Sequence, residues 1–177
     1  MFASPFFWIV VAVALFWAVG AYNRLVRLRS AAIQAFSALD AHLVRLLALL
    51  GECEASLAVV PGEPVQARTA LQAATMQMGV SLAVARTQPL QAEAAAALST
   101  ARHALEAAWQ GAAAQQAATE GGLQRPRWLE HLEQHQAPSA QALERFNLAV
   151  QQYNEAIDQF PAKWLAWLYG FQPGRTL

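Results

Sequence analysis

The segment that most constrains the fold of this 177-residue chain is an uncharged run near its start. Residues 6–22, FFWIVVAVALFWAVGAY, hold no Lys, Arg, Asp or Glu over 17 positions. At about 1.5 Å per helical residue, such a run just spans a hydrocarbon layer about 30 Å thick. Ser4 and Pro5 suit the N-cap and the first position of a helix. We therefore predict a transmembrane anchor over residues 1–22.

A cleaved signal peptide and a buried core helix are the two alternatives for this run. A signal peptide needs a positively charged start, and residues 1–5 contain no Lys or Arg. Trp8 lies near one end of the run, and Trp17 and Tyr22 lie towards the other, as expected of amphipathic rings at the two membrane interfaces. The uncleaved anchor is the favoured interpretation.

Positive charge follows the run directly, at Arg24, Arg27 and Arg29, whereas only the terminal amine precedes it. Because Lys and Arg are retained on the cytoplasmic side of a membrane, we expect the N-terminus outside and the rest of the chain in the cytoplasm. The single cysteine, Cys53, is consistent with a reducing compartment.

Apolar residues recur every three or four positions through the rest of the chain, which predicts helices over about 23–60, 64–87, 90–118 and 139–161. Pro61-Gly62, Pro89 and Pro138 mark the expected breaks, and Ser139 is the expected N-cap of the last helix. No alternation of period two indicates a strand. We predict an all-α fold, in which an N-terminal transmembrane helix continues into an antiparallel up-down four-helix bundle with long helices, over residues 23–161. The apolar stripe of the first helix comprises Leu25, Leu28, Ala32, Phe36, Leu39, Leu43, Leu46, Leu50, Cys53 and Leu57.

This topology returns residues 162–177 to the membrane. They form an aromatic segment with Trp164, Trp167, Tyr169 and Phe171 after Lys163. Rings beside a cation suit the lipid headgroup region. Alternatively, the rings close the end of the core against the first helix, and the sequence leaves both interpretations open.

Composition excludes several classes of protein. The chain has 12 Lys and Arg against 12 Asp and Glu, so it lacks the basic excess that binding to nucleic-acid phosphates requires. With 56% hydrophobic and 14% charged residues it is too apolar for a disordered coil. A single cysteine excludes an internal disulfide and a cysteine-based zinc site.

His131 and His135 are four residues apart and could share a metal ion on a helix. The metalloprotease motif needs Glu directly after the first His, however, and Leu132 stands there. Cys53 lies on an apolar stripe, where a thiol is usually an inert hydrophobe. We therefore expect no catalytic residue, no cofactor and no metal site, and a metal-dependent hydrolase at the two histidines is the least favoured alternative.

Polar residues point instead to a structural contact. Asn23 and Arg29 follow the apolar run, while Asn147, Asn154 and Asp158 share one face of the last helix. We expect Asn23 or Arg29 to meet this face across the bundle and to fix helix register. A solvated face is the alternative, and a lipid or ligand site is less favoured.

Two blocks carry a resemblance to a known family. YNRLVRLRSAAIQAFSALDAHL, residues 22–43, resembles the opening of the LemA family, where a membrane helix runs into Tyr-Asn-x-Leu-Val-x-Leu-Arg and then Ile-Asp-x-x-Leu. FNLAVQQYNEAIDQFPAKWLAWLYGF, residues 146–171, is similar to the family's C-terminal Tyr-Asn-x-x-Val-x-x-Tyr-Asn-x-x-Ile-x-x-Phe-Pro and Gly-Phe. The matched positions include Asn23, Arg29, Asp40, Asn147, Tyr153, Asn154 and Pro161. Residues 44–53, VRLLALLGEC, depart from the family's basic pair and Asp-Leu-Ile-Pro-Asn-Leu, so the chain resembles a divergent, more apolar member.

The resemblance implies a bacterial, membrane-anchored helical bundle without an assigned enzymatic activity. We expect a non-enzymatic, single-pass protein of the bacterial cytoplasmic (inner) membrane, whose bundle is a scaffold for self-association or for a membrane or cytoplasmic protein partner. Apolar surface beyond what one bundle needs favours a homo-oligomer. The alternative function is a membrane-surface module that senses or shapes the bilayer through its C-terminal aromatic segment.

Overall fold

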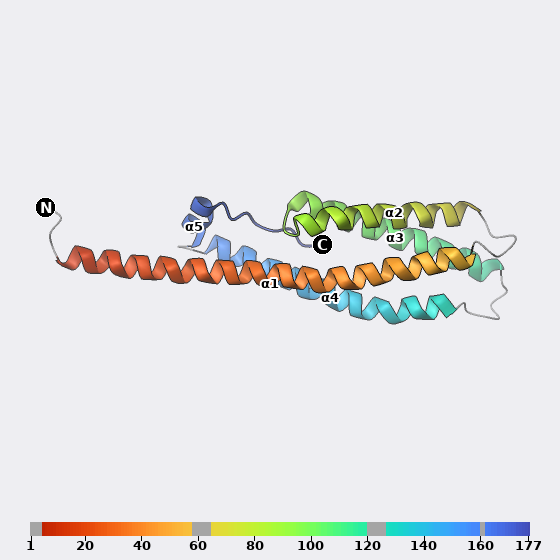
Figure 1. Cartoon of the computed structure of the whole chain (residues 1–177), viewed down its shortest axis with the longest axis horizontal. Coiled ribbons are helices and arrows are strands. Elements are labelled where there is room, and N and C mark those ends of the chain that lie inside the picture. The colour runs from red at the N-terminus through yellow and green to blue at the C-terminus, as the bar shows by residue number, and fades with distance from the viewer. Residues whose placement is uncertain (1–4, 58–64, 120–126, 160–161) are drawn as a thin grey trace.

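The computed structural model describes residues 5–57, 65–119, 127–159 and 162–177, and these ranges contain helices and no strands. The helices are α1 (Pro5–Leu57), α2 (Val65–Thr87), α3 (Ala92–Thr119), α4 (Arg127–Asp158) and α5 (Ala162–Tyr169). The four long helices run alternately in opposite directions, and the short α5 lies beside α1 (Figure 1). The predicted all-α fold, with a long apolar first helix and an antiparallel bundle, is confirmed.

The first helix continues from the apolar run into the bundle without a break, and it passes through Gly51. Its N-terminal part extends beyond the other helices (Figure 1). Large apolar side chains are exposed all along this part, and Phe16 is 84% exposed. Among the described helices, α1 alone is long and apolar enough to cross a membrane. No other described part of the chain therefore packs over this part of α1.

Two helix pairs make the bundle. Helix α1 packs along α4, α2 packs along α3, and the second pair meets the first through the contact between α1 and α2. The α2–α3 pair covers only the C-terminal half of α1 (Figure 1). Within the described ranges, α3 makes no close backbone approach to α1 or α4. One side of the bundle is therefore more loosely closed than the others.

The predicted apolar stripes form the core. Phe36 of α1 and Phe146 of α4 meet edge to face, with ring centroids 5.7 Å apart, an arrangement that aromatic quadrupoles favour. A smaller cluster around Leu25 and Tyr153 joins α1, α4 and α5. The buried stripe residues of the main core include Ala32, Leu39, Leu43 and Leu50 of α1, Leu71, Met78 and Leu82 of α2, Leu98, Ala101 and Leu105 of α3, and Val150 of α4.

The predicted start of the last bundle helix is wrong. Helix α4 begins at Arg127 rather than at residue 139, so Pro138 and Ser139 lie inside it and Ser139 is not its N-cap. An internal proline removes one backbone hydrogen bond, and the long packing of α4 against α1 outweighs that loss. Helix α4 also ends earlier than predicted, at Asp158, before the separate helix α5. Helices α2 and α3 begin and end within two residues of prediction, whereas the predicted end of the first helix at residue 60 lies outside the described residues.

Candidate functional site

The chain reverses direction after α5 and returns along the bundle. Gly170 follows the last residue of α5 with a φ of 69°, a conformation that glycine adopts without strain. The Phe171 N–H donates to the Ala166 carbonyl oxygen at 2.9 Å, which completes a Schellman cap of α5. Residues 171–177, here called the C-terminal strap, then run back towards the middle of the bundle (Figure 1).

Two asparagines of α4 hold this strap. The Asn154 side-chain amide donates to the Gly174 carbonyl oxygen at 2.7 Å and accepts from the Gly174 N–H at 2.8 Å. Asn147 makes the same pair of bonds with Leu177, at 3.0 Å and 2.8 Å. Seven helical residues and three extended residues both cover about 10 Å, so the two spacings match. The asparagines thus grip the strap at two points through its backbone.

The structure therefore gives Asn147 and Asn154 a partner different from the one predicted. Their amides bond to the C-terminal strap and not to Asn23 or Arg29 of α1. Asn23 and Asp158 are exposed. Pro161 lies outside the described residues. The shared face of the two asparagines was predicted, but its occupant was not.

A close backbone approach fixes the strap at Gly174. A Cβ atom at this position would lie 3.2 Å from Cγ1 of Val150 and 3.4 Å from Cδ2 of Leu90. The strap therefore lies between α4 and the α2–α3 connection. A residue larger than glycine at position 174 would fit only if Val150 or Leu90 moved.

Side chains of α1 contact the residue that follows α4, as well as α5 and the strap. The Arg29 guanidinium carbon lies 5.8 Å from the centroid of the Phe171 ring, which is within the range of a cation–π contact. Arg24 Nη1 donates to Gln159 Oε1 at 3.1 Å. The Tyr22 ring lies 5.1 Å from that of Tyr169 and 6.0 Å from that of Phe171, between centroids. Arg27 is exposed.

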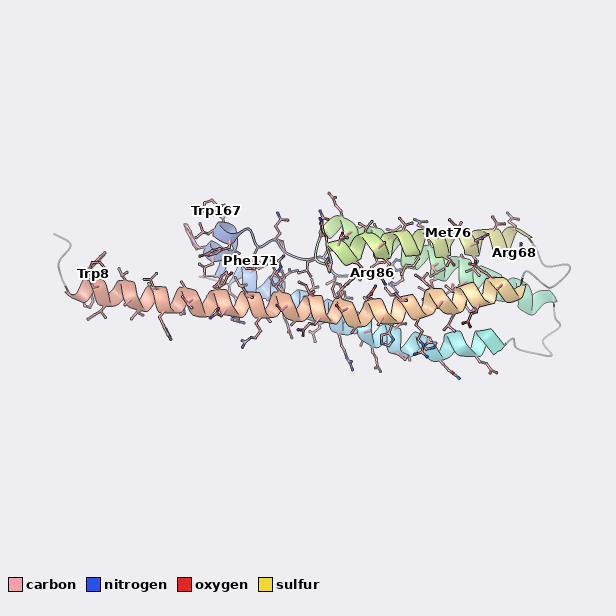
Figure 2. The ribbon with its side chains drawn as sticks, in the orientation of Figure 1. Trp8, Arg68, Met76, Arg86, Trp167 and Phe171 are labelled. Carbon is pink, nitrogen blue, oxygen red and sulfur yellow. The ribbon has the colours of Figure 1, made fainter. Side chains whose placement is uncertain are left out.

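The C-terminal aromatic residues divide between the two interpretations left open by the sequence. Tyr169 and Phe171 pack against Tyr22 of α1, as the core interpretation expects. Trp164 and Trp167 are 67% and 81% exposed. Figure 2 shows Trp167 pointing away from α1 and Phe171 lying nearer to it. Because Tyr22 ends the apolar run, the exposed rings of α5 lie at the level where that run gives way to the bundle.

Tyr153 and Asp40 serve packing and register. Tyr153 is only 1% exposed. Its burial raises the pKa of the phenol above the ordinary value, and the charge of Arg29 partly opposes this.

Asp40 Oδ1 accepts a hydrogen bond from Arg86 Nε at 2.7 Å, which joins α1 to α2. The pKa of Arg86 is raised mainly by this hydrogen bond and, to a smaller extent, by the negative charge of Asp40.

The candidates for chemistry are dispersed. His135 lines a cavity, and the side chain of His131 lies outside the described part of α4. Cys53 is buried in α1. Within the described residues, no three His, Cys, Asp or Glu side chains gather as a metal site would require.

The chain matches no protein-family model, no curated protein and no solved structure. The resemblance to the LemA family therefore remains a prediction from residues 22–43 and 146–171, and function must be inferred from the geometry of the chain itself.

Proposed function

We propose that this chain is a non-enzymatic, single-pass membrane protein whose helical bundle is a scaffold for self-association. The observation that carries the proposal is the apolar surface that the bundle leaves uncovered. One part is the start of α1, where Phe6, Trp8 and Ile9 are each more than 60% exposed. Lipid would cover this part, and α1 would link the bilayer to the bundle as one continuous helix.

The second uncovered surface is a stripe on α2, formed by Met76, Val80 and Val84. Their exposed fractions are 68%, 67% and 50%. They follow one another at intervals of four residues and so share one helix face. Figure 2 shows Met76 on the side of α2 that faces away from α1. Contiguous exposed apolar residues mark interaction sites, and a second copy could cover the stripe through a symmetric contact.

Placement in the bacterial inner membrane, as a divergent LemA protein, belongs to the same proposal. Arg24, Arg27 and Lys163 are exposed near the end of the apolar run, and such cations favour the cytoplasmic side. The bundle would then lie in the cytoplasm, where a membrane or cytoplasmic protein could also dock on it.

The mass of the complex tests the scaffold proposal. We expect light scattering of the full chain in detergent, corrected for bound detergent, to give more than one copy, and Val80→Glu to lower the mass. Gln77→Glu is the matched control, because it adds the same charge beside the stripe at another exposed position of α2. A monomeric wild type, or equal effects of both substitutions, would contradict self-association through this stripe.

A second candidate function is a membrane-surface module, and α5 favours it. Ala162 and Ala166 of α5 are buried against the bundle, whereas Trp164, Trp167 and Leu168 are exposed on its other side. Apolar rings beside Lys163 suit the headgroup region. In a Trp8→Phe and Trp17→Phe background, which removes the tryptophans of the apolar run, lipids brominated at known depths should quench the remaining tryptophan fluorescence near the headgroups. We expect Trp164→Phe with Trp167→Phe to remove that component, and its persistence would reject the interfacial position.

A further inference from the structure

The loosely closed side of the bundle contains a cavity of about 310 Å³ between α1, α3 and α4. Its volume lies at the lower end of the range for ligand pockets, about 300–1,000 Å³. Leucines form most of its wall: Leu43, Leu46 and Leu50 of α1, Leu98 and Leu105 of α3, and Leu143 of α4. Protein interiors are normally close-packed. A space of this size lined by leucines is therefore suited to an apolar ligand.

One side of the cavity carries a cation. Arg102 lines it from α3. Its Nη2 atom lies 3.3 Å from Nε2 of His103. A carboxylate is the preferred partner of a guanidinium, because the two groups form charge-assisted hydrogen bonds.

Other polar groups also face the cavity. Ser99 and Ser139 contribute hydroxyls, and His135 and Glu106 also line it. Among the described residues, Glu106 forms no ion pair with Arg102, so it does not satisfy the guanidinium. The cavity thus combines a long apolar wall with one cation in its lining.

We propose that this cavity binds a single-chain fatty acid, with its alkyl chain along the leucines and its carboxylate paired with the guanidinium of Arg102. Leu177 forms part of the wall, and Asn147 holds the backbone of Leu177. The C-terminal strap therefore contributes to the wall of the site. This binding site is separate from the stripe on α2 and does not depend on self-association.

Photolabelling of the full chain in lipid nanodiscs tests the site. The probe is a dodecanoic acid with a diazirine on its alkyl chain, and labelled residues are mapped by mass spectrometry. We expect labels on cavity residues such as Leu98 and Leu105, and also on the start of α1 from probe dissolved in the bilayer. The labels on α1 report the amount of probe in the membrane and serve as an internal reference.

Two substitutions and one control decide between outcomes. Arg102→Gln should lower cavity labelling at least about tenfold relative to α1, as loss of a hydrogen bond to a charged group predicts. Leu98→Trp should fill the space and abolish cavity labelling, and Leu105→Phe replaces it if that variant melts early by circular dichroism. Arg145→Gln removes an exposed arginine of α4 that does not line the cavity, and it should change nothing.

A diazirine-bearing dodecanol tests the role of the head group, and it should label the cavity much less than the acid. Equal labelling by the alcohol and the acid would overturn the carboxylate contact with Arg102. Absence of cavity labels in the wild type, or labels that survive both Arg102→Gln and the cavity-filling substitution, would overturn the site itself.

Discussion

The side-chain amide of Asn154 and the backbone of Gly174 form two reciprocal hydrogen bonds, 2.7 Å and 2.8 Å long. An asparagine amide offers N–H donors and an oxygen acceptor side by side, so it pairs with the N–H and C=O of one extended residue much as a neighbouring strand would. Asn147 repeats the arrangement at Leu177. These bonds recognise backbone, and the close approach to Val150 is what restricts the residue at position 174.

Removal of one asparagine should release the strap locally. Asn154→Ala deletes both bonds to Gly174 and leaves two half-buried backbone groups without these partners, which should lower the free energy of unfolding by about 1–3 kcal/mol. Urea denaturation measures this loss, and hydrogen exchange should become faster in residues 171–177 first. Asn23→Ala removes an exposed amide of α1 and should stay within about 0.5 kcal/mol of the wild type. Unchanged exchange in the strap would contradict the clamp.

Truncation of an aromatic ring in the core should have a larger effect. Phe146 is fully buried and meets Phe36 edge to face. Phe146→Ala should therefore lower the free energy of unfolding by about 3–5 kcal/mol, from lost burial and the cavity that remains. Leu148→Ala is the control on the same helix, because Leu148 is 55% exposed, and it should change stability by less than half as much. Similar losses in both variants would show that α4 does not face α1 as described.

The phenol of Tyr153 should make the protein sensitive to alkaline pH. Burial raises the pKa of Tyr153 in the folded state, so the native protein holds this proton at a pH where the unfolded chain has lost it. The stabilisation from the buried neutral phenol is thus complete below the unfolded pKa, about 10, and declines as the pH rises towards the folded pKa. Urea denaturation at pH 9 and pH 11 should show a smaller decline for Tyr153→Phe than for the wild type. Tyr169→Phe, at a 60% exposed position, should retain the full decline.

The core was largely predictable because helical period alone determines which side of a helix is apolar. Phe36, Leu39 and Leu43 follow that period and are buried, as are Leu71 and Met78. Polar residues were harder to interpret, since a helix face tells which side chains lie together but not what meets them. The partner of Asn154 lies 20 residues along the chain and reaches it only because α5 and Gly170 reverse the chain.

The cavity also has no signal in the sequence. Leu43, Leu98 and Leu143 follow the same apolar period as residues in close contact, and the space between them depends on the distance between α3 and α4. Likewise, local preference predicted a helix start at Ser139, whereas packing along α1 carries α4 past Pro138. Tertiary contacts between helices determine the cavity and the start of α4, so neither can be predicted from the sequence of a single helix.

Pro138 offers a test of how strongly packing holds α4 together. Proline has no N–H to donate to the carbonyl of Gln134, and its ring crowds that carbonyl, at a cost of about 3 kcal/mol relative to alanine in a helix interior. Pro138→Ala should therefore raise the free energy of unfolding by about 1–3 kcal/mol and slow hydrogen exchange on either side of residue 138. Ala140→Pro, two residues further along the same helix, should have the opposite effect. A loss of stability in Pro138→Ala would instead mean that the local geometry at the proline is needed for α4 to follow α1. Ser139 and Ala140 line the cavity, so fatty-acid labelling of the same variant would show whether that geometry also shapes the cavity wall.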